Sequence, residues 1–300
     1  MIERLARKVN NISNLRFRAL ISLPYLFYRF LRRRTGIPNY KIDTINGVKY
    51  RLDLNELIDY SIFMRGYFEE STHNAIKALC KKDMHVIDIG ANIGAHTFNL
   101  AKIVGNNGSV IAFEPMEWAF KKLKKNFDLN DFDNIILENS GLSDETIEKE
   151  EHFRSSWPVD KKTFSRVFSE QTKEIDSKNI KIKNKLQFSR LDDYLKKHRK
   201  SVDLIKIDVD GYELKILKGA EDVLKNNSLI IIMELCPMCL LRCGDNVEDL
   251  VAYLDEKGFK FYNEQTMEIY SNIEQMLSFF PGLSSINVVL SKKDIVVDKS

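Results

Sequence analysis

The most informative segment of the chain is Val86-Ile-Asp-Ile-Gly-Ala-Asn-Ile-Gly94, where a short apolar strand pattern runs into a turn with two glycines. Glycine permits positive φ angles and close backbone approach, so the segment predicts a tight turn at a strand end. A helical pattern follows at once over residues 94–104, and a helix N-terminus offers free N–H groups to a ligand. The segment therefore predicts strand 85–89, a ligand-binding turn and a helix.

Strand patterns alternate with helical patterns on both sides of this segment, as in βαβ units. We expect a Rossmann-like α/β fold with a seven-stranded, mostly parallel sheet, helices on both faces and a hairpin-like pair of terminal strands. The expected strands are residues 85–89, 109–113, 134–138, 203–207, 229–233, 259–263 and 286–291. The expected helices are residues 70–81, 94–104, 116–129, 212–225 and 246–257.

Residues 1–58 precede this pattern and are expected to form a basic helical arm and a β-hairpin. Asn46-Gly47 between alternating apolar residues is typical of a type I′ hairpin turn. Residues 1–34 are basic and amphipathic, so they either lie on an anionic membrane surface or pack their apolar side on the main domain. The main domain is expected over residues 59–300. Its insertion at about 144–187 is either a lid or substrate-binding segment, or a partly disordered loop.

Charge is unevenly distributed along the chain. Residues 1–41 contain ten Lys or Arg and one acidic residue, whereas the whole chain has a net charge of +3, so residues 42–300 carry −6. An acidic body without a basic, aromatic-laced stripe argues against nucleic acid as a partner.

Neither a membrane span nor a secreted disulfide scaffold is expected. The apolar run 19–31 contains Pro24 and Arg29 and is too short to span a bilayer. Four cysteines without a cleavable signal pattern suggest a reducing compartment. We expect a cytoplasmic protein, with peripheral membrane contact through the arm as an open alternative.

Acidic residues follow two neighbouring strands, at the edge where open parallel sheets bind ligands. Asp88 lies in the glycine turn, where its charge repels a pyrophosphate and attracts an amino group. Glu114 ends the next strand, and a carboxylate there accepts two hydrogen bonds from a ribose diol. Together they favour S-adenosylmethionine as cofactor. An NAD-dependent oxidoreductase is disfavoured because Asn92 stands at the middle glycine position of G-x-G-x-x-G.

Further motifs follow in order along residues 60–290. They are Gly66-Tyr-Phe-Glu69, Val110-Ile-Ala-Phe-Glu-Pro115, Asn139-Ser-Gly-Leu-Ser-Asp144, Arg190-Leu-Asp-Asp193, Ile205-Lys-Ile-Asp-Val-Asp-Gly-Tyr-Glu213, Leu217-Lys-Gly-Ala220 and Met233-Glu-Leu235. With these motifs the chain resembles the FkbM-type S-adenosylmethionine-dependent methyltransferases. The resemblance implies the class I methyltransferase fold and methyl transfer, usually to an oxygen of a sugar or related small molecule.

The resemblance also implies a set of cofactor-binding residues. The glycine turn would shape the methionine side of the cofactor site, Glu114 would hold the ribose, and residues 141–143 would lie by the adenine. The full expected set is Glu69, Asp88, Gly90, Ala91, Asn92, Gly94, Glu114, Pro115, Gly141, Leu142, Ser143 and Asp208.

Lys206, Asp208 and Asp210 alternate along one strand and its exit, so their side chains are expected to face the same side. Asp208 and Glu234 end adjacent central strands and are candidates for a base that assists a hydroxyl nucleophile. We therefore expect Lys206, Asp208 and Glu234 to be the catalytic residues. Carboxylates also suit Mg²⁺ or Ca²⁺, but no metal is expected.

Two other motifs carry less weight. Cys236-Pro-Met-Cys239-Leu-Leu-Arg-Cys243 lacks a nearby fourth metal ligand, so we expect a loop and short helix with partly buried thiols. His152, in the insertion, is the histidine we would test as a substrate-side base, whereas His85 and His96 are expected to be structural.

The leading hypothesis is a small-molecule O-methyltransferase that acts on a hydroxyl of a sugar or glycoconjugate. The alternative is a noncatalytic cofactor-binding or partner-binding module of the same fold. The presence of Asp88, Glu114 and Asp208 together argues against that alternative.

Overall fold

The computed structural model describes residues 39–151, 184–198, 200–278 and 285–296. The predicted basic arm over residues 1–34 lies outside these residues, as do His152 and most of the predicted insertion. Within the described part, no helix is long and apolar enough to cross a membrane.

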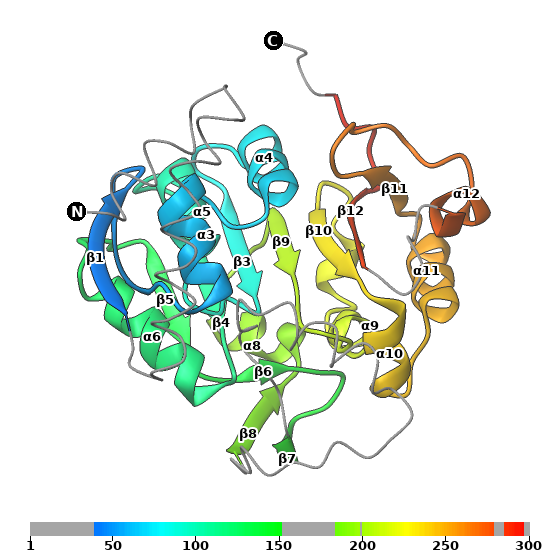
Figure 1. Cartoon of the computed structure of the whole chain (residues 1–300). Helices are drawn as coiled ribbons and strands as arrows, with labels where there is room; N and C mark the ends of the chain where they lie inside the picture. Colours follow the sequence, from blue (N-terminus) through cyan, green and yellow to red (C-terminus); the bar gives the residue numbers. More distant parts are fainter. Residues whose placement is uncertain (1–38, 152–183, 199, 279–284, 297–300) are drawn as a thin grey trace.

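A seven-stranded sheet forms the centre of the molecule, in the order β11-β12-β10-β9-β3-β4-β5 (Figure 1). Its strands are β3 (His85–Ile89), β4 (Ser109–Phe113), β5 (Ile135–Glu138), β9 (Leu204–Ile207), β10 (Ile230–Leu235), β11 (Lys260–Asn263) and β12 (Ile286–Ser291). Neighbours from β5 to β10 are parallel, and β12 runs antiparallel between β10 and β11. The predicted class I methyltransferase sheet, with its antiparallel terminal pair, is confirmed.

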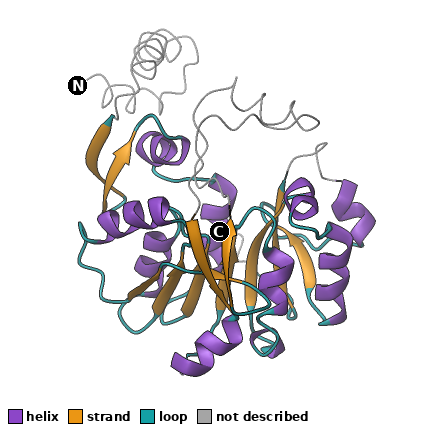
Figure 2. Cartoon of the chain, turned by 90° about the horizontal axis from the view of Figure 1, so that it is seen from below, coloured by secondary structure: helices purple, strands orange, loops and turns teal. Residues whose placement is uncertain are grey.

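Helices cover both faces of this sheet (Figure 2), because successive strand side chains enter two different apolar cores. On β3, Val86 enters one core and Ile87 the other; Leu204 and Ile205 do the same on β9. The first core is covered by α3 (Leu57–Arg65), α4 (Glu70–Leu79), α5 (Thr97–Val104) and α6 (Glu117–Phe127). The second is covered by α8 (Leu191–His198), α9 (Glu213–Lys218), α10 (Pro237–Arg242), α11 (Val247–Glu256) and α12 (Ile273–Ser278).

The predicted hairpin consists of β1 (Tyr40–Ile45) and β2 (Val48–Asp53), joined at Asn46 and Gly47, which both have positive φ. Val48 and Leu52 are fully buried in the core that also contains α4 and α5. The hairpin therefore packs as part of the main body, and the predicted boundary after residue 58 stays a prediction.

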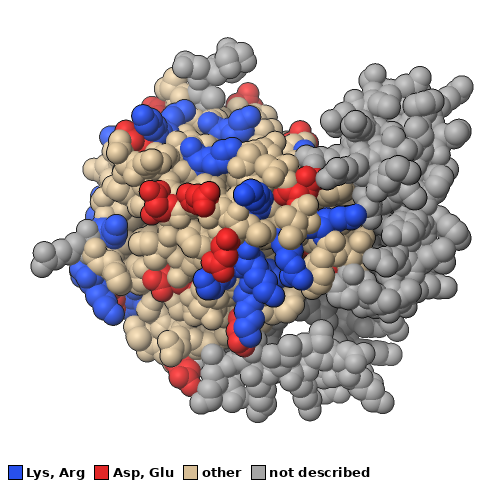
Figure 3. All heavy atoms as spheres, turned by 90° about the vertical axis from the view of Figure 1, so that its left-hand side faces the viewer, with Lys and Arg blue, Asp and Glu red and all other residues tan. Residues whose placement is uncertain are grey.

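Charges of both signs are mixed on the face that carries the hairpin and α6 (Figure 3). Along α6, Glu117 pairs with Lys121 and Lys124 pairs with Asp128, each four residues apart and exposed. Such pairs support a solvated helix and contribute little energy.

Several elements were not predicted from the sequence. β6 (Gly141–Leu142), just before the predicted insertion, forms a small sheet with β7 (Ile147–Glu151) and β8 (Asn184–Ser189), which lie at its two ends. Helices α3 and α8 were also missed. The predicted helix 212–225 is divided into α9 and the 3-10 helix η1 (Val223–Lys225). The chain leaves α9 at Gly219, where a Cβ would lie 2.0 Å from the Ser143 carbonyl oxygen.

The cysteine motif forms the predicted short helix, α10, but its thiol state differs from the prediction. Cys236 and Cys239 are paired as a disulfide, so the expectation of thiols is wrong for these two. Their spacing around the first turn of the helix brings the Cα atoms to 5.2 Å, within the usual disulfide range. Cys243 is a half-buried thiol outside this disulfide, as predicted.

Candidate functional site

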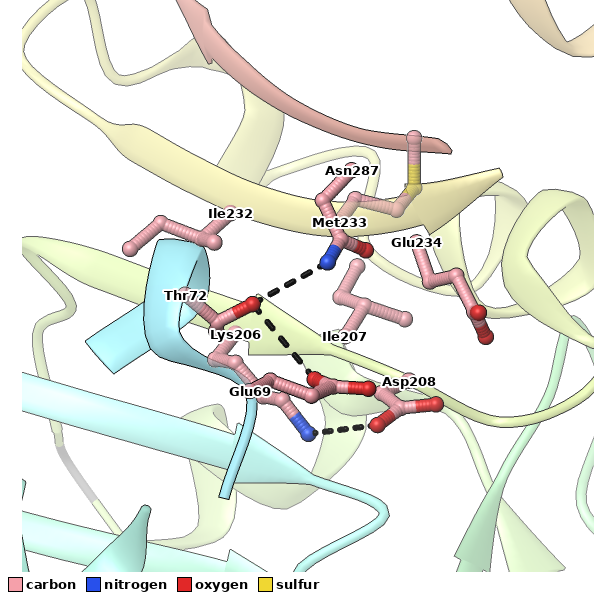
Figure 4. A pocket seen from close by; sticks show the side chains of 9 residues that line it. All are labelled: Glu69, Thr72, Lys206, Ile207, Asp208, Ile232, Met233, Glu234 and Asn287. Atoms are coloured by element: carbon pink, nitrogen blue, oxygen red, sulfur yellow. Dashed lines mark hydrogen bonds and ion pairs between the residues drawn. The ribbon is translucent and has the colours of Figure 1, made fainter. Parts of the chain in front are cut away.

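The carboxyl ends of β3, β4, β9 and β10 lie at one edge of the sheet, and a small pocket lies beside β9 and β10. Helix α4 and its N-cap wall one side, and β12 contributes to another. The pocket is lined by Glu69, Thr72, Lys206, Ile207, Asp208, Ile232, Met233, Glu234 and Asn287 (Figure 4). The structure thus brings all three predicted catalytic residues and the predicted Glu69 into one pocket.

Lys206 connects this pocket to the turn after β3. Lys206 and Asp88 are paired in register on parallel strands, so their side chains share a face of the sheet. Lys206 Nζ lies 3.1 Å from Asp208 Oδ2 and 3.8 Å from Asp88 Oδ1. Burial opposes the charge of Lys206, but the two carboxylates outweigh burial and raise its pKa above the ordinary value. Lys206 is therefore a fixed cation between the turn and the pocket.

Asp208 and Glu234 end adjacent strands and differ in protonation. Burial favours the neutral form of Asp208, but the Lys206 ammonium outweighs burial and holds the pKa of Asp208 below its usual value. For Glu234, burial and then the Asp208 charge raise the pKa well above its usual range. At neutral pH an ionised Asp208 and a protonated Glu234 thus end adjacent strands.

Glu114 holds the turn after β3 from the end of β4. Its Oε2 accepts the main-chain N–H of Asn92 and its Oε1 accepts that of Met116, each at 2.8 Å. Burial raises the pKa of Glu114 to about 7. The turn also touches β9, because a Cβ at Gly90, whose φ is +82°, would lie 1.9 Å from the Asp208 carbonyl oxygen. The glycine predicted for a tight turn is thus required by the approach of two strand ends.

The carboxyl groups of the turn fit a ligand that offers hydrogen-bond donors. Asp88 is fully buried, and its Oδ2 accepts the Thr97 hydroxyl at 2.6 Å. Its Oδ1 accepts no hydrogen bond from the described part of the chain. Glu69 and Glu114 add further acceptors. The ammonium and ribose diol of S-adenosylmethionine are donors, so the residues present fit this cofactor.

Residues 141–143 begin beside the Glu114 turn. Asn139 Nδ2 donates to the carbonyl oxygens of Glu114 at 2.8 Å and Pro115 at 3.3 Å, which joins the exits of β4 and β5. Leu142 is buried in an apolar core, and the N–H of Ser143 donates to the Ser189 carbonyl at 3.0 Å. The position of residues 141–143 beside the adenine stays a prediction. Because the Leu142 side chain is buried in the core, its main chain would have to make this contact.

Asp210 does not line the pocket with Lys206 and Asp208, although its charge interacts with the charges of both. It is exposed and has a φ of +52° in the turn before α9. Glu213 closes this turn from inside, since its Oε1 accepts the N–H of Gly211 at 3.2 Å. Burial raises the pKa of Glu213 to about 7.

Sequence patterns missed two polar residues of the pocket wall, Thr72 and Asn287. The Thr72 hydroxyl donates to Glu69 Oε2 at 3.4 Å and accepts a hydrogen bond from Asn287 Nδ2 at 3.0 Å. His96 was expected to be structural, yet its Nε2 lies 3.8 Å from Glu69 Oε2. Thr72 and Asn287 follow no parallel strand, so the strand-end rule does not find them. The polar Asn287 within an apolar strand pattern was the available signal.

The described residues contain no group of three or more His, Cys, Asp or Glu side chains arranged to hold a metal ion.

The sequence matches a known domain family and a known protein. Residues 88–261 match the methyltransferase FkbM domain. Methyltransferase 1 of Beauveria bassiana (strain ARSEF 2860) is 27% identical over 165 residues, which span 51% of this chain and 65% of that protein.

Two solved structures are similar at lower identity. Methyltransferase FkbM from Methylobacillus flagellatus KT has 14% identity and a TM-score of 0.43, covering 96% of this chain and 57% of that one. TYW2 of M. jannaschii, in complex with AdoMet, has 14% identity and a TM-score of 0.43, covering 85% of each chain. Because the domain match covers more than half of the sequence, the chain belongs to the FkbM methyltransferase domain family, whose cofactor is S-adenosylmethionine.

Proposed function

We propose that the protein transfers the methyl group of S-adenosylmethionine directly to a hydroxyl of a sugar, a glycoconjugate or a related small molecule. The observation that carries this proposal is the position of Asp208. Its carbonyl oxygen contacts the Gly90 turn, and its carboxylate lines the pocket. A cofactor on the turn and an acceptor in the pocket would therefore meet at Asp208.

On the cofactor side, different residues would bind different parts of S-adenosylmethionine. Asp88 and Glu69 offer carboxylate oxygens to the ammonium group, and Glu114 offers its carboxylate to the ribose diol. The bound cofactor supplies a methyl group already activated by the sulfonium.

On the acceptor side, Asp208 is ionised at neutral pH because Lys206 stabilises its charge. It can accept a hydrogen bond from the acceptor hydroxyl, fix the direction of the oxygen lone pair, and take the proton as the new bond forms. A carboxylate of low pKa is a weak base, so most of the rate enhancement would come from orientation. The Lys206 ammonium, 3.1 Å from Asp208 Oδ2, holds the Asp208 carboxylate in place.

The walls of the pocket support a sugar-like acceptor. Glu234, Asn287 and Thr72 provide hydrogen-bond donors and acceptors, while Ile232 and Met233 provide apolar surface. Sugars present hydroxyl groups at the rim of the ring and C–H groups on its faces, so this mixed lining matches both.

The test is incubation of the purified protein with S-adenosylmethionine and a panel of free and glycosidically linked sugars, followed by mass spectrometry for added methyl groups. Asp208→Asn should keep cofactor affinity and lose roughly 100-fold or more in turnover. Glu256→Gln, at an exposed carboxylate at the end of α11, is the control and should stay active. Full activity of Asp208→Asn would remove this residue from the mechanism. Cofactor binding without methylation of any sugar would favour the noncatalytic module.

A further inference from the structure

The disulfide between Cys236 and Cys239 lies directly after β10, which ends at Leu235 (Figure 1). Cys236 is the N-cap of α10, and its carbonyl oxygen accepts the N–H groups of Cys239 and Leu240, each at 3.0 Å. The disulfide therefore closes the same helical turn as these two hydrogen bonds. Glu234, which lines the pocket, is two residues before Cys236. The disulfide thus holds the exit of a strand that carries a pocket residue.

Helix α10 also packs on the turn that follows β9. A Cβ at Gly211, whose φ is +112°, would lie 2.2 Å from the Cys239 carbonyl oxygen and 2.9 Å from Cys243 Sγ. Gly211 lies three residues after Asp208, so the helix touches the exit of the other strand that carries a pocket carboxyl group. The disulfide-bonded turn is therefore next to both strand ends that line the pocket.

The two ends of α10 are held by different means. At its C-terminal end, Lys215 Nζ from α9 donates to the Cys243 carbonyl oxygen at 2.5 Å and pairs with Asp245 Oδ2 at 2.7 Å. The N–H of Asp245 donates to the Leu240 carbonyl oxygen at 3.0 Å. The first turn of the helix depends instead on the disulfide and on the two hydrogen bonds to Cys236. Breaking the disulfide should therefore loosen the first turn and the strand end before it, while the rest of the helix stays in place.

The disulfide is accessible and closes a short loop. Cys236 and Cys239 are half-buried, and Leu241 and Arg242, which follow them, are exposed. A bridge between residues three positions apart removes less entropy from the unfolded chain than a bridge across a long loop. A chain of 300 residues with two large apolar cores does not need such a bridge in order to fold. Accessible disulfides are typically the labile or regulatory ones.

We propose that Cys236 and Cys239 form a reversible thiol–disulfide site, which exchanges with small dithiols and small disulfides, and that its disulfide form fixes the side of the pocket that carries Glu234. This inference goes beyond the proposed methyl transfer and does not depend on the identity of the acceptor. The turn of residues 88–94 is held by Glu114 through the N–H of Asn92, away from α10. The cofactor side should therefore not respond to the redox state.

Reduction proceeds by two exchange steps. A thiolate of the dithiol attacks one cysteine sulfur, the sulfur–sulfur bond breaks with its electron pair left on the other cysteine, and a mixed disulfide forms. The second thiolate of the reductant then attacks the reductant's own sulfur in the mixed disulfide, which releases the remaining cysteine as a thiolate. The two protons of the dithiol pass to the two cysteine thiolates, and the reductant leaves as a cyclic disulfide. A small-molecule disulfide reverses the reaction and is itself reduced to two thiols.

The experiment treats the purified full chain with dithiothreitol or with glutathione disulfide, without denaturant, and counts thiols by alkylation and mass spectrometry. Dithiothreitol should open the disulfide and glutathione disulfide should restore it. Hydrogen–deuterium exchange then compares the two forms. The amides of Cys239 and Leu240 should exchange roughly 10-fold or more faster in the reduced form, because the disulfide no longer limits opening of their turn. Exchange over residues 85–94 should stay unchanged.

Two variants serve as controls. Cys80→Ala removes a buried thiol from the opposite core and should respond to both reagents as the wild type does. The double variant Cys236→Ser with Cys239→Ser should exchange like the reduced wild type and should not respond to dithiothreitol.

Three results would overturn the proposal. A disulfide that dithiothreitol opens only in denaturant, or cysteines that glutathione disulfide does not pair, would contradict a reversible site. Unchanged exchange at Cys239 and Leu240 after reduction would contradict the link to the pocket, as would equally faster exchange over residues 85–94. If the double variant fails to fold, the two redox forms of the wild type alone test the proposal. Absence of methyl transfer to any sugar would contradict the proposed function and leave this inference standing.

Discussion

The turn after β3 and the pocket beside β9 and β10 both bury carboxyl groups, but they stabilise them by different means. In the turn, Glu114 accepts main-chain N–H groups, which the fold itself fixes. In the pocket, Asp208 depends on the side chain of Lys206, which it shares with Asp88 from another strand. Main-chain partners hold the turn rigidly. The charge of the pocket, in contrast, depends on each of the side chains of Lys206, Asp88 and Asp208.

The largest expected effect comes from Gly90→Ala, which breaks the contact between the two regions. Its φ is +82°, and a Cβ would lie 1.9 Å from the Asp208 carbonyl oxygen, so one strand end must move. We expect a loss of about 4 kcal/mol or more in the free energy of unfolding, together with loss of cofactor binding. Chemical denaturation and calorimetric titration measure the two.

Gly244→Ala is the matched control, because Gly244 has a similar φ of +83° with nothing within 4 Å of an added Cβ. It should lose only about 1–2 kcal/mol, the cost of a left-handed alanine. Similar losses at both positions would show that the close approach to Asp208 has no energetic weight.

Lys206→Met should have the next largest effect, because it leaves Asp88 and Asp208 without their common cation. Asp88 is fully buried, and breaking a buried ion pair by removing one partner costs about 3–5 kcal/mol. Denaturation with urea at pH 7 measures the loss. Lys260→Met, which removes an exposed pair with Asp294, should change stability little. Adding Asp88→Asn to Lys206→Met should recover part of the loss, and a further loss instead would contradict the role of Lys206 as shared cation.

Glu213→Gln changes a buried carboxyl group that accepts a hydrogen bond in the turn before α9 and does not line the pocket. Burial raises the pKa of Glu213 to about 7, above its value in an unfolded chain. Its ionisation in the folded protein is therefore unfavourable, and stability falls as pH rises from about 4.5 toward 7. The variant should gain about 1–3 kcal/mol relative to wild type between pH 5 and pH 8. A difference that does not change with pH would mean that Glu213 ionises as freely in the folded chain as in the unfolded one.

The smallest expected effect is a change of cofactor affinity with pH, caused by the titration of Glu114 in the turn. Burial raises the pKa of Glu114 to about 7, and ribose hydroxyls donate to the ionised form. Cofactor affinity should therefore fall as pH drops through 7, by roughly 10-fold between pH 7.5 and pH 6. Calorimetric titration at each pH measures this, and Glu114→Gln should bind more weakly with a flatter profile. The same pH slope in both proteins would assign the titration to another group.

Much of the fold followed from local patterns, because parallel strands buried on both faces leave continuous apolar runs. The seven strands of the central sheet were all expected. Helix α8 and the small β6-β8-β7 sheet were missed, since their short segments depend on partners far along the chain, as in the pairing of Gly141 with Phe188. Cys236 and Cys239 were misjudged because spacing alone does not distinguish thiols from a disulfide.

The site, like the fold, was predictable from the sequence only in part. Asp88, Glu114, Asp208 and Glu234 were found because they directly follow or end parallel strands, a relation that is local in sequence. Other properties arise only when distant segments meet: the hydrogen bond from Asn287 to Thr72 joins residues 215 positions apart. The charge of Lys206, the protonation of Glu234 and the position of Glu69 all depend on such neighbours. The order of strands and the cofactor turn could therefore be inferred from the chain alone, whereas the electrostatics of the pocket required the fold, because burial and through-space charge decide pKa values.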